Sequence, residues 1–370
     1  MLRSLLRLVL IPILGFSFFQ AFSQDLKTKN LVIVTLDGFR WEEVFRGSDS
    51  ALVESKFTEG KNEIRLKFGA STVSERRKKL LPFFWSELVS KGQIYGNRDL
   101  GNMDEISNPY YFSYPGYNEI FTGFPDPRIN TNGALLNPNK NVLEFFNEQK
   151  GMEGKVAVFS SWERFPQIFN ISRSKILVNS GYKDLELPKN SARIQLLNKI
   201  QHEGPKLLGD STRLDFLTYE MGMNYMDEFK PRILYFSFDE TDDFAHEGHY
   251  DWYLKAAHTE DDFIRMLWEK IQSNPFYKDK TTLILTCDHG RGKGDGTGDR
   301  WTDHGKGTPA SNQTWFAILG PDTPNSGEMK ISSTTYHKQL AQTMAKFLGL
   351  DFKASAGHEV GEAISSVLKN

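Results

Sequence analysis

Five short runs of β-branched and apolar residues recur along the chain, and none of them alternates regularly with polar residues. They cover residues 31–36 (LVIVTL), 155–160, 233–238 (ILYFSF), 282–287 and 315–319. A strand shows this continuous pattern when both faces of its sheet are covered. The runs therefore predict a mostly parallel central sheet that is buried between layers of helices.

Segments with helical periodicity lie between these runs, at 141–149, 192–201, 215–229, 253–272 and 336–348. Strands that alternate with helices along the chain indicate an α/β fold with helices on both faces of the sheet. We find no internal repeat and no low-complexity linker, so residues 24–370 are expected to form a single domain with small insertions. The polar stretch 46–79 is the candidate insertion or lid.

Residues 1–23 have the layout of a secretory signal peptide. A basic start precedes an apolar stretch over 8–19, and small residues predict cleavage between Ser23 and Gln24. This stretch is shorter than the roughly 20 apolar residues that span a bilayer, and it contains Pro12. We therefore expect a cleaved export signal, no stable membrane anchor, and a periplasmic or extracellular protein.

Composition argues against binding to a nucleic-acid polymer and against stabilisation by an internal disulfide. The formal net charge is −2, from 45 basic and 47 acidic residues, so the chain has no electrostatic footprint for a nucleic-acid polymer. The single Cys287 cannot form a disulfide within the chain, and the expected fold depends on its hydrophobic core. The sequence leaves the oligomeric state open.

Acidic residues and histidines follow three of the expected strands. Asp37 ends the first run, Asp288 and His289 follow the fourth, and the third leads into a segment with Asp242 and His246. Ligands of open α/β sheets gather at the carboxyl ends of the strands, and carboxylates brought together in a partly dry cleft repel one another. Cations remove this conflict, and mixed imidazoles and carboxylates suit zinc-type ions. The pattern predicts a metal site.

These residues also resemble, in their order, the motifs of the alkaline phosphatase superfamily. That superfamily includes nucleotide pyrophosphatases/phosphodiesterases, alkaline phosphatases, sulfatases and cofactor-independent phosphoglycerate mutases. The resemblance spans residues 31–320 and implies an alkaline-phosphatase-like α/β fold. The matching positions are Asp37 in VTLDGFRW, Ser113 in SYPGYNEIFTG, Asp242 and His246 in DDFAH, Asp288 and His289 in the first DHG, and His304 in the second.

The resemblance implies two divalent metal ions, zinc or alternatively manganese or iron. Ions placed in this way clamp the attacking and leaving oxygens of an in-line displacement. The second Asp-His-Gly copy is expected to supply only His304 as a metal ligand, and Asp303 is expected to be a loop residue. The role of the glycine-rich loop 290–303 stays open. One ion would be held by Asp37, Ser113, Asp288 and His289, and the other by Asp242, His246 and His304.

Three other residues near these motifs are weighed for supporting roles. Asp239 and Asp243 are expected to support the metal ligands from behind. His249 is the alternative ligand to His246, although a histidine on a helix surface is more commonly structural.

Ser113 is the expected nucleophile, because the superfamily has Thr, Ser or a modified Cys at this position. Coordination to a metal ion lowers the pKa of a serine hydroxyl and aims it. The backbone N–H groups that follow, at the start of an expected helix, are expected to hold a phosphate oxygen. A formylglycine sulfatase is disfavoured, since Tyr117 stands where its motif has Arg. Chain length and the export signal disfavour a phosphoglycerate mutase.

Gly116, Asn132 and Arg164 are the expected substrate-binding residues. Diesterases of the superfamily often have Asn where this chain has Gly116, and Asn132 resembles an asparagine of the monoesterases. Those monoesterases also use a Lys-x-Arg pair, of which Arg164 keeps the arginine while Trp162 replaces the lysine. Because arginine binds a dianion in a bidentate manner, Arg164 favours a monoester.

The sequence therefore predicts an exported, metal-dependent phosphoesterase that hydrolyses small phosphate monoesters through a covalent phosphoserine. A phosphodiesterase or nucleotide pyrophosphatase is the first alternative, and transfer of a phosphoryl or phosphonyl headgroup is the second. A non-catalytic, metal-stabilised binding module is the alternative outside enzymes.

Overall fold

The computed structural model describes residues 26–188, 190–296 and 299–369. The expected export signal, residues 1–23, lies outside the described residues. Within the described ranges, no helix combines the length and the apolar character that crossing a bilayer requires.

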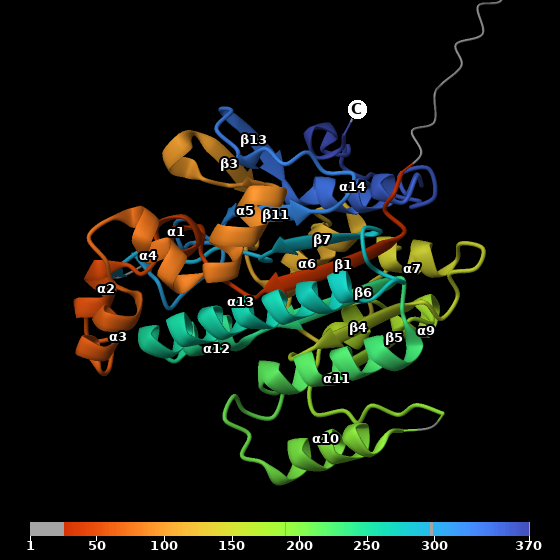
Figure 1. Ribbon diagram of the computed structural model, residues 1–370, viewed down its shortest axis with the longest axis horizontal. Coiled ribbons are helices and arrows are strands. Elements are labelled where there is room, and N and C mark those ends of the chain that lie inside the picture. The colour runs from red at the N-terminus through yellow and green to blue at the C-terminus, as the bar shows by residue number, and fades with distance from the viewer. Residues whose placement is uncertain (1–25, 189, 297–298, 370) are drawn as a thin grey trace, which may run out of the picture.

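An eight-stranded sheet forms the centre of the molecule (Figure 1). Among the strands described in this sheet, β11 runs antiparallel to both neighbours, and the other neighbouring pairs are parallel. The prediction of a mostly parallel central sheet is confirmed. In spatial order the strands are β12 (Gly327–Glu328), β2 (Gln93–Tyr95), β11 (Phe316–Leu319), β7 (Thr281–Thr286), β1 (Asn30–Leu36), β6 (Ile233–Phe238), β4 (Val156–Ser160) and β5 (Leu177–Ser180).

Two small sheets accompany the central one. The first has the order β10-β3-β13, and the second pairs β8 with β9. Their strands are two to four residues long. Their bounds are β3 (Asn102–Glu105), β8 (Asp295–Gly296), β9 (Asp299–Arg300), β10 (Gln313–Thr314) and β13 (Ser333–Tyr336).

Helices cover both faces of the central sheet. In chain order they are α1 (Trp41–Arg46), α2 (Ser50–Glu54), α3 (Lys61–Phe68), α4 (Val73–Leu80), η1 (Phe84–Leu88), α5 (Val89–Lys91), η2 (Arg98–Leu100), α6 (Ser113–Thr122), α7 (Val142–Asn147), α8 (Phe165–Ile168), α9 (Ile171–Ser174), α10 (Ala192–Glu203), α11 (Asp215–Phe229), α12 (Glu240–His246), α13 (Tyr250–Ser273), η3 (His337–Gln339), α14 (Leu340–Phe347) and η4 (Ser365–Val367).

Alternate side chains of β1 enter two different hydrophobic cores. Val32 and Val34 pack in the core beneath α11 and α13, the helices that Figure 1 shows in front of the sheet. Leu31 and Ile33 pack in the other core, with α6 and α14. Because both faces of the strand are buried, its sequence shows a continuous apolar run, as the sequence pattern indicated.

The register of the central strands places the ends of β1, β6 and β7 together. Thr35 of β1 pairs with Ser237 of β6 on one side and with Thr286 of β7 on the other. The chain after each strand therefore leaves the sheet at the same edge, and this edge carries the acidic residues that the sequence pattern singled out.

The predicted helices are present, with one difference at the last. The segment 336–348 was expected to be helical throughout, but Tyr336 pairs with Glu105 in the small sheet and ends β13. The helix then begins with a 3₁₀ turn at His337–Gln339 before α14. Tertiary pairing thus overrides the local helical pattern. The stretch 46–79 contains α2, α3 and most of α4, and its action as a lid stays a prediction.

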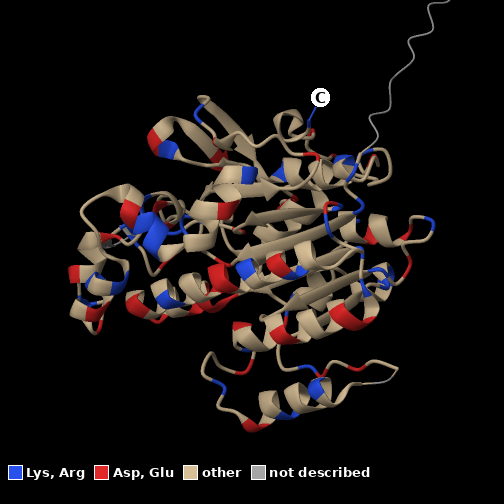
Figure 2. Ribbon diagram, viewed as in Figure 1, with Lys and Arg blue, Asp and Glu red and all other residues tan. Residues whose placement is uncertain are grey.

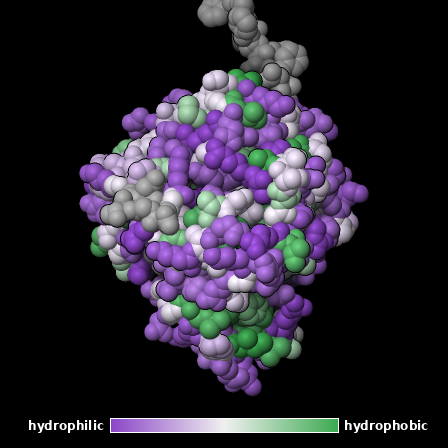
Figure 3. All heavy atoms as spheres, turned by 90° about the vertical axis from the view of Figure 1, so that its left-hand side faces the viewer, coloured by the Kyte–Doolittle hydropathy of each residue, from purple (hydrophilic) through white to green (hydrophobic). Residues whose placement is uncertain are grey.

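The outer surface is mostly polar. Basic and acidic residues are interspersed over the outer helices (Figure 2), in keeping with the net charge of −2. Figure 3 shows an apolar patch at the lower end, where α10 lies. The exposed apolar side chains in that region include Leu196, Ile200 and Leu207.

Candidate metal centre and nucleophile

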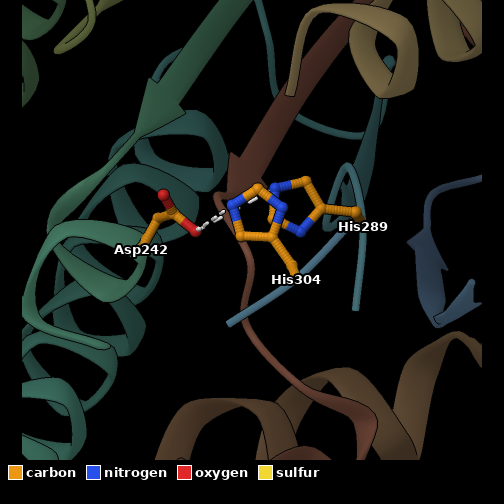
Figure 4. A group of neighbouring side chains, drawn as sticks. All are labelled: Asp242, His289 and His304. Atoms are coloured by element: carbon orange, nitrogen blue, oxygen red, sulfur yellow. Dashed lines mark ion pairs between the residues drawn. The ribbon is translucent and has the colours of Figure 1, made fainter. Parts of the chain in front are cut away.

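The end of the sheet brings together side chains from distant parts of the chain. Asp37 follows β1, Asp288 and His289 follow β7, Asp242 lies in α12 after β6, and His304 lies on the loop after β9. Figure 4 shows Asp242, His289 and His304 pointing toward one another. The strand ends meet here because the strands are parallel and in register.

The first group of potential ligands consists of Asp37, Asp288 and His289, whose ligand atoms lie within 4.8 Å of one another. His289 Nε2 lies 3.4 Å from Asp37 Oδ1 and 3.4 Å from Asp288 Oδ2. Both carboxylate oxygens are buried without a hydrogen-bond partner among the described residues. Such atoms cost free energy unless something binds them. A divalent cation between them removes that cost, so the group fits a metal ion.

The pKa values of the two carboxyl groups, Asp37 and Asp288, reflect their burial. Burial, followed by the charges of Asp288 and Asp242, raises the pKa of Asp37 well above its ordinary value. Burial also raises the pKa of Asp288, against the opposing effect of His289. A bound cation inverts this balance by stabilising the ionised carboxylates. Each carboxylate is also held by a donor: Tyr117 Oη donates to Asp37 Oδ2 at 2.7 Å, and the Gly38 N–H donates to Asp288 Oδ1 at 3.0 Å.

The tautomers of two histidines are set by backbone carbonyls. His289 Nδ1 lies 3.0 Å from the carbonyl oxygen of Gly290, and His304 Nδ1 lies 3.1 Å from that of Tyr111. A carbonyl oxygen only accepts, so each Nδ1 carries the proton and each Nε2 presents its lone pair to the cluster. Both rings are therefore oriented as metal ligands.

The second group consists of Asp242, His289 and His304. Asp242 Oδ1 lies 3.9 Å from His289 Nε2 and 3.8 Å from His304 Nε2. His246 adjoins the group, with its Nε2 atom 2.9 Å from His304 Nε2 and 3.2 Å from Asp242 Oδ2. Two imidazole nitrogens at this distance need a proton or a cation between them. The structure thus places His289 in both groups, whereas the sequence assigned it to one ion.

Ser113 stands where the two groups meet. It is the first residue of α6, it is buried, and its Oγ lies 3.5 Å from His289 Nε2. Tyr111, two residues before Ser113, has a backbone φ of 56°, which is uncommon for a tyrosine. Asn108 Oδ1 holds this turn by accepting from the N–H groups of Tyr110 and Tyr111. Backbone strain of this kind gathers at functional sites.

The start of α6 does not offer the N–H groups that were expected to hold a phosphate oxygen. The Tyr114 N–H donates to Asn132 Oδ1 at 2.9 Å, and the Gly116 N–H donates to the Phe112 carbonyl at 3.0 Å. Pro115 has no N–H. These groups are already engaged, so that expectation is wrong.

Gly116 and Asn132 both lie close to the nucleophile. A Cβ atom on Gly116 would lie 2.4 Å from the carbonyl oxygen of Asp288, so glycine lets α6 approach the end of β7. Asn132 is exposed, and because its Oδ1 binds the Tyr114 N–H, the Nδ2 group is the part that can turn toward a substrate. Contact of either residue with a substrate stays a prediction.

Arg164 lies at the carboxyl end of β4, which neighbours β6 at the same edge of the sheet. Its Nη2 atom pairs with Glu163 Oε1 at 3.0 Å, and its guanidinium lies 5.9 Å from the ring centroid of Trp162. Its Nε is buried without a hydrogen-bond partner among the described residues. The location suits substrate binding, which also stays a prediction.

Four residues that the sequence pattern placed near the ligands are Asp239, Asp243, Asp303 and His249. Burial and neighbouring carboxylates raise the pKa of Asp239 well above its ordinary value, and burial followed by the charge of Asp242 raises that of Asp243 to about 7. Asp303 Oδ2 accepts from Arg300 Nε at 2.9 Å within the loop. Neither group of potential ligands among the described residues contains His249.

Sequence reasoning missed two residues of the site, Gly38 and Arg291, and it assigned no role in the site to Tyr117. Gly38 has φ 57°, and a Cβ there would lie 2.5 Å from Asp242 Oδ1. Arg291 is buried and donates to Asp242 Oδ1. Tyr117 holds Asp37. The spacing of four between Ser113 and Tyr117 puts them on one helix face and could have indicated that Tyr117 lies at the site. A glycine after a strand and an arginine after a histidine carry no comparable signal.

No protein-family model and no curated protein match the sequence. Solved structures do match the fold. Alkaline phosphatase PafA has a TM-score of 0.59 at 11% identity, covering 93% of this chain and 99% of that chain. The phosphonate monoester hydrolase of Agrobacterium radiobacter has a TM-score of 0.54 at 13% identity, covering 92% and 77%. A 2-O GAG sulfatase has a TM-score of 0.54 at 12% identity, covering 92% and 74%.

Proposed function

We propose that this chain, whose fold is that of the alkaline phosphatase superfamily, is an exported phosphoesterase that hydrolyses small phosphate monoesters. One observation carries the proposal: Ser113 Oγ lies 3.5 Å from His289 Nε2, and His289 belongs to both groups of potential ligands. From this position the Ser113 hydroxyl can attack the phosphorus atom of a substrate that lies between the two groups of potential ligands.

The proposed cofactor is a pair of divalent metal ions, zinc or alternatively manganese or iron. Asp37, Asp288 and His289 would hold one together with Ser113, and Asp242, His246 and His304 would hold the other. The orphaned carboxylate oxygens and the Nε2 lone pairs described above are the donors that zinc prefers. Bound there, such ions lower the pKa of a serine hydroxyl and neutralise phosphoryl charge.

The reaction needs two displacements at phosphorus. Ser113 Oγ attacks, and the new Oγ–P bond forms as the bond between phosphorus and the leaving oxygen breaks, which releases the alcohol. Water then attacks the phosphoserine, the Oγ–P bond breaks, and inorganic phosphate and free serine are restored.

Arg164 supports a monoester, because a guanidinium can bind the two terminal charges of its phosphoryl group. Two observations favour the phosphodiesterase alternative instead. Glu163 already pairs with Arg164, and its carboxylate opposes a dianion. Trp162 stands where the monoesterases have lysine, which leaves one positive charge fewer.

Formylglycine-type sulfate hydrolysis is disfavoured by the role of Tyr117. This residue stands where the formylglycine motif has Arg, and here it is fully buried and donates to Asp37 Oδ2 at 2.7 Å. Transfer to an acceptor other than water differs only in the group that attacks the phosphoserine, so the same residues would serve it.

The proposal is tested with zinc-loaded mature protein and three substrates that share a p-nitrophenol leaving group: a phosphate monoester, a methyl phosphodiester and a sulfate ester. We expect kcat/KM for the monoester to exceed the others by at least tenfold. A diester preference selects the phosphodiesterase alternative, and a sulfate preference overturns phosphoester hydrolysis. Bound zinc without turnover of any ester indicates the binding module. Mass spectrometry of protein recovered from outside the cytoplasm tests for an N-terminus at Gln24.

A further inference from the structure

Arg291 is a buried arginine beside the second group of potential ligands, and no step above uses it. Its exposed fraction is 1%. Each of its three guanidinium nitrogens donates one hydrogen bond: Nη1 to Asp242 Oδ1, Nε to the Trp301 carbonyl at 2.9 Å, and Nη2 to the Thr302 carbonyl at 2.6 Å. A buried guanidinium is costly unless it is paired in this way.

These three contacts join three separate segments of the chain. Arg291 itself comes two residues after His289. Asp242 lies on α12, and Trp301 and Thr302 belong to the loop that leads to His304. One side chain therefore connects the segments that carry all three members of the second group.

The surroundings of Arg291 leave it little freedom to move. Gly38 packs directly on the pair, since a Cβ there would lie 2.5 Å from Asp242 Oδ1 and 2.7 Å from Arg291 Nη1. The indole of Trp301 is fully buried and packs edge-on against Tyr250 and Phe57. The carbonyl that receives Arg291 Nε is thus fixed by the core, and the guanidinium is fixed in turn.

The two groups of ligands are supported differently. Asp37 and Asp288 receive neutral donors, the Tyr117 hydroxyl and the Gly38 N–H. Asp242 receives a charged donor instead.

We propose that Arg291 is a positioning residue that pre-assembles the second metal position, by holding Asp242 and the loop of His304 in place, while the first position forms without it. The inference rests on the two-ion centre of the proposed function. A carboxylate oxygen has more than one lone pair, so Asp242 Oδ1 can accept from the guanidinium and still bind a cation. The positive charge of Arg291 also repels that cation, which weakens its binding. In our proposal the gain in affinity from orienting the ligands is larger than this loss.

The test is a zinc titration of metal-free protein in competition with a chromophoric chelator, which counts equivalents and measures both affinities without turnover. Wild-type protein is expected to bind two equivalents. Arg291→Met is expected to bind the first with wild-type affinity and the second at least about 10-fold more weakly. Arg300→Met is the matched control, because Arg300 lies in the same loop but is exposed and pairs with Asp303. It is expected to keep both equivalents.

Unchanged binding by Arg291→Met, or a tighter second equivalent, overturns the positioning role. Circular dichroism and thermal melting show whether this variant folds. If it does not, Arg291→Lys keeps a cation but cannot reach all three partners, so it is expected to weaken the second equivalent alone, and wild-type affinity would again overturn the role. A wild-type protein that binds none of zinc, manganese and iron refutes the proposed metal centre itself, which distinguishes the two failures.

Discussion

The side-chain oxygen of Asn132 accepts a hydrogen bond from the backbone N–H of Tyr114 at 2.9 Å, so an exposed loop residue caps the helix that begins at Ser113. This contact fixes the loop beside the nucleophile. It also separates two roles of Asn132, because Oδ1 serves the helix and Nδ2 is the donor that can serve a substrate.

Asn132→Asp is expected to keep the melting temperature and to lose activity. The variant retains the acceptor for the Tyr114 N–H, but its negative charge repels an anionic substrate, and kcat/KM should fall by about 10- to 100-fold. Asn132→Ala should lose activity and also about 1 kcal/mol of stability. Melting curves and steady-state kinetics on a phosphate monoester check both effects. Wild-type kcat/KM in Asn132→Asp would remove Asn132 from the substrate-binding site.

Tyr117→Phe is expected to weaken zinc binding by about 10- to 100-fold, because residues that orient metal ligands typically have effects of this size. The change removes the donor at 2.7 Å from Asp37 Oδ2. Competition with a chelator measures the dissociation constant. Tyr95→Phe is the control, since its hydroxyl contacts Gln93 and Ser366 away from the centre. Equal zinc affinities in the two variants would contradict the role of Tyr117.

Arg164→Ala is expected to lower kcat/KM for a phosphate monoester by about 10- to 100-fold and to change that for a diester far less. The reason is that only the monoester presents two terminal charges to the guanidinium. Arg193→Ala, which removes an exposed arginine paired with Glu220, should leave both values unchanged. Equal losses on monoester and diester would argue against recognition of a dianion.

Much of the fold could be predicted from the sequence, because buried parallel strands leave a continuous apolar pattern that the 233–238 run shows along the whole of β6. The short strands β2 and β12 left no such signal, since they depend on neighbours far away in the chain. Tyr336 shows the same limit, because its pairing with Glu105 is tertiary.

Most candidate ligands could be found because carboxylates and histidines after strands are unusual in number and type, whereas Ser113 and His304 followed from the resemblance in motif order. Two residues that support these ligands could not be found in this way. Arg291 and Gly38 are explained only by the atoms that surround them, namely Asp242 Oδ1 and the carbonyls of Trp301 and Thr302. The sharing of His289 between two groups likewise depends on distances that no spacing encodes.

His337 is expected to make the stability depend on pH. It is fully buried, and its Nε2 lies 2.8 Å from Asp104 Oδ2. Burial acts to lower the pKa of His337, but Asp104 outweighs it, with smaller contributions from Glu119 and Asp288, and the pKa lies above the ordinary 6.5. A raised folded-state pKa stabilises the protein fully below the unfolded-state value, and this contribution disappears as pH rises through the folded-state value.

The free energy of unfolding of wild-type protein, minus that of His337→Gln, should therefore be largest below pH 6.5 and should decrease as pH rises. Denaturant titrations at several pH values measure this difference, in which contributions of groups that do not interact with His337 cancel. His202→Gln is the control, because His202 pairs with Asp184 at the surface and surface pairs contribute little. A difference that does not change with pH would contradict the prediction.

Covalent trapping at Ser113 tests the central claim most directly. Zinc-loaded protein is mixed with a phosphate monoester, quenched in acid during turnover and digested for peptide mass spectrometry. We predict one phosphoryl group on the peptide that contains Ser113, and in Ser113→Ala we predict unchanged zinc content, no phosphoryl group and turnover reduced by roughly 10³-fold or more. A phosphoryl group on another residue, or full turnover by Ser113→Ala, would contradict the account.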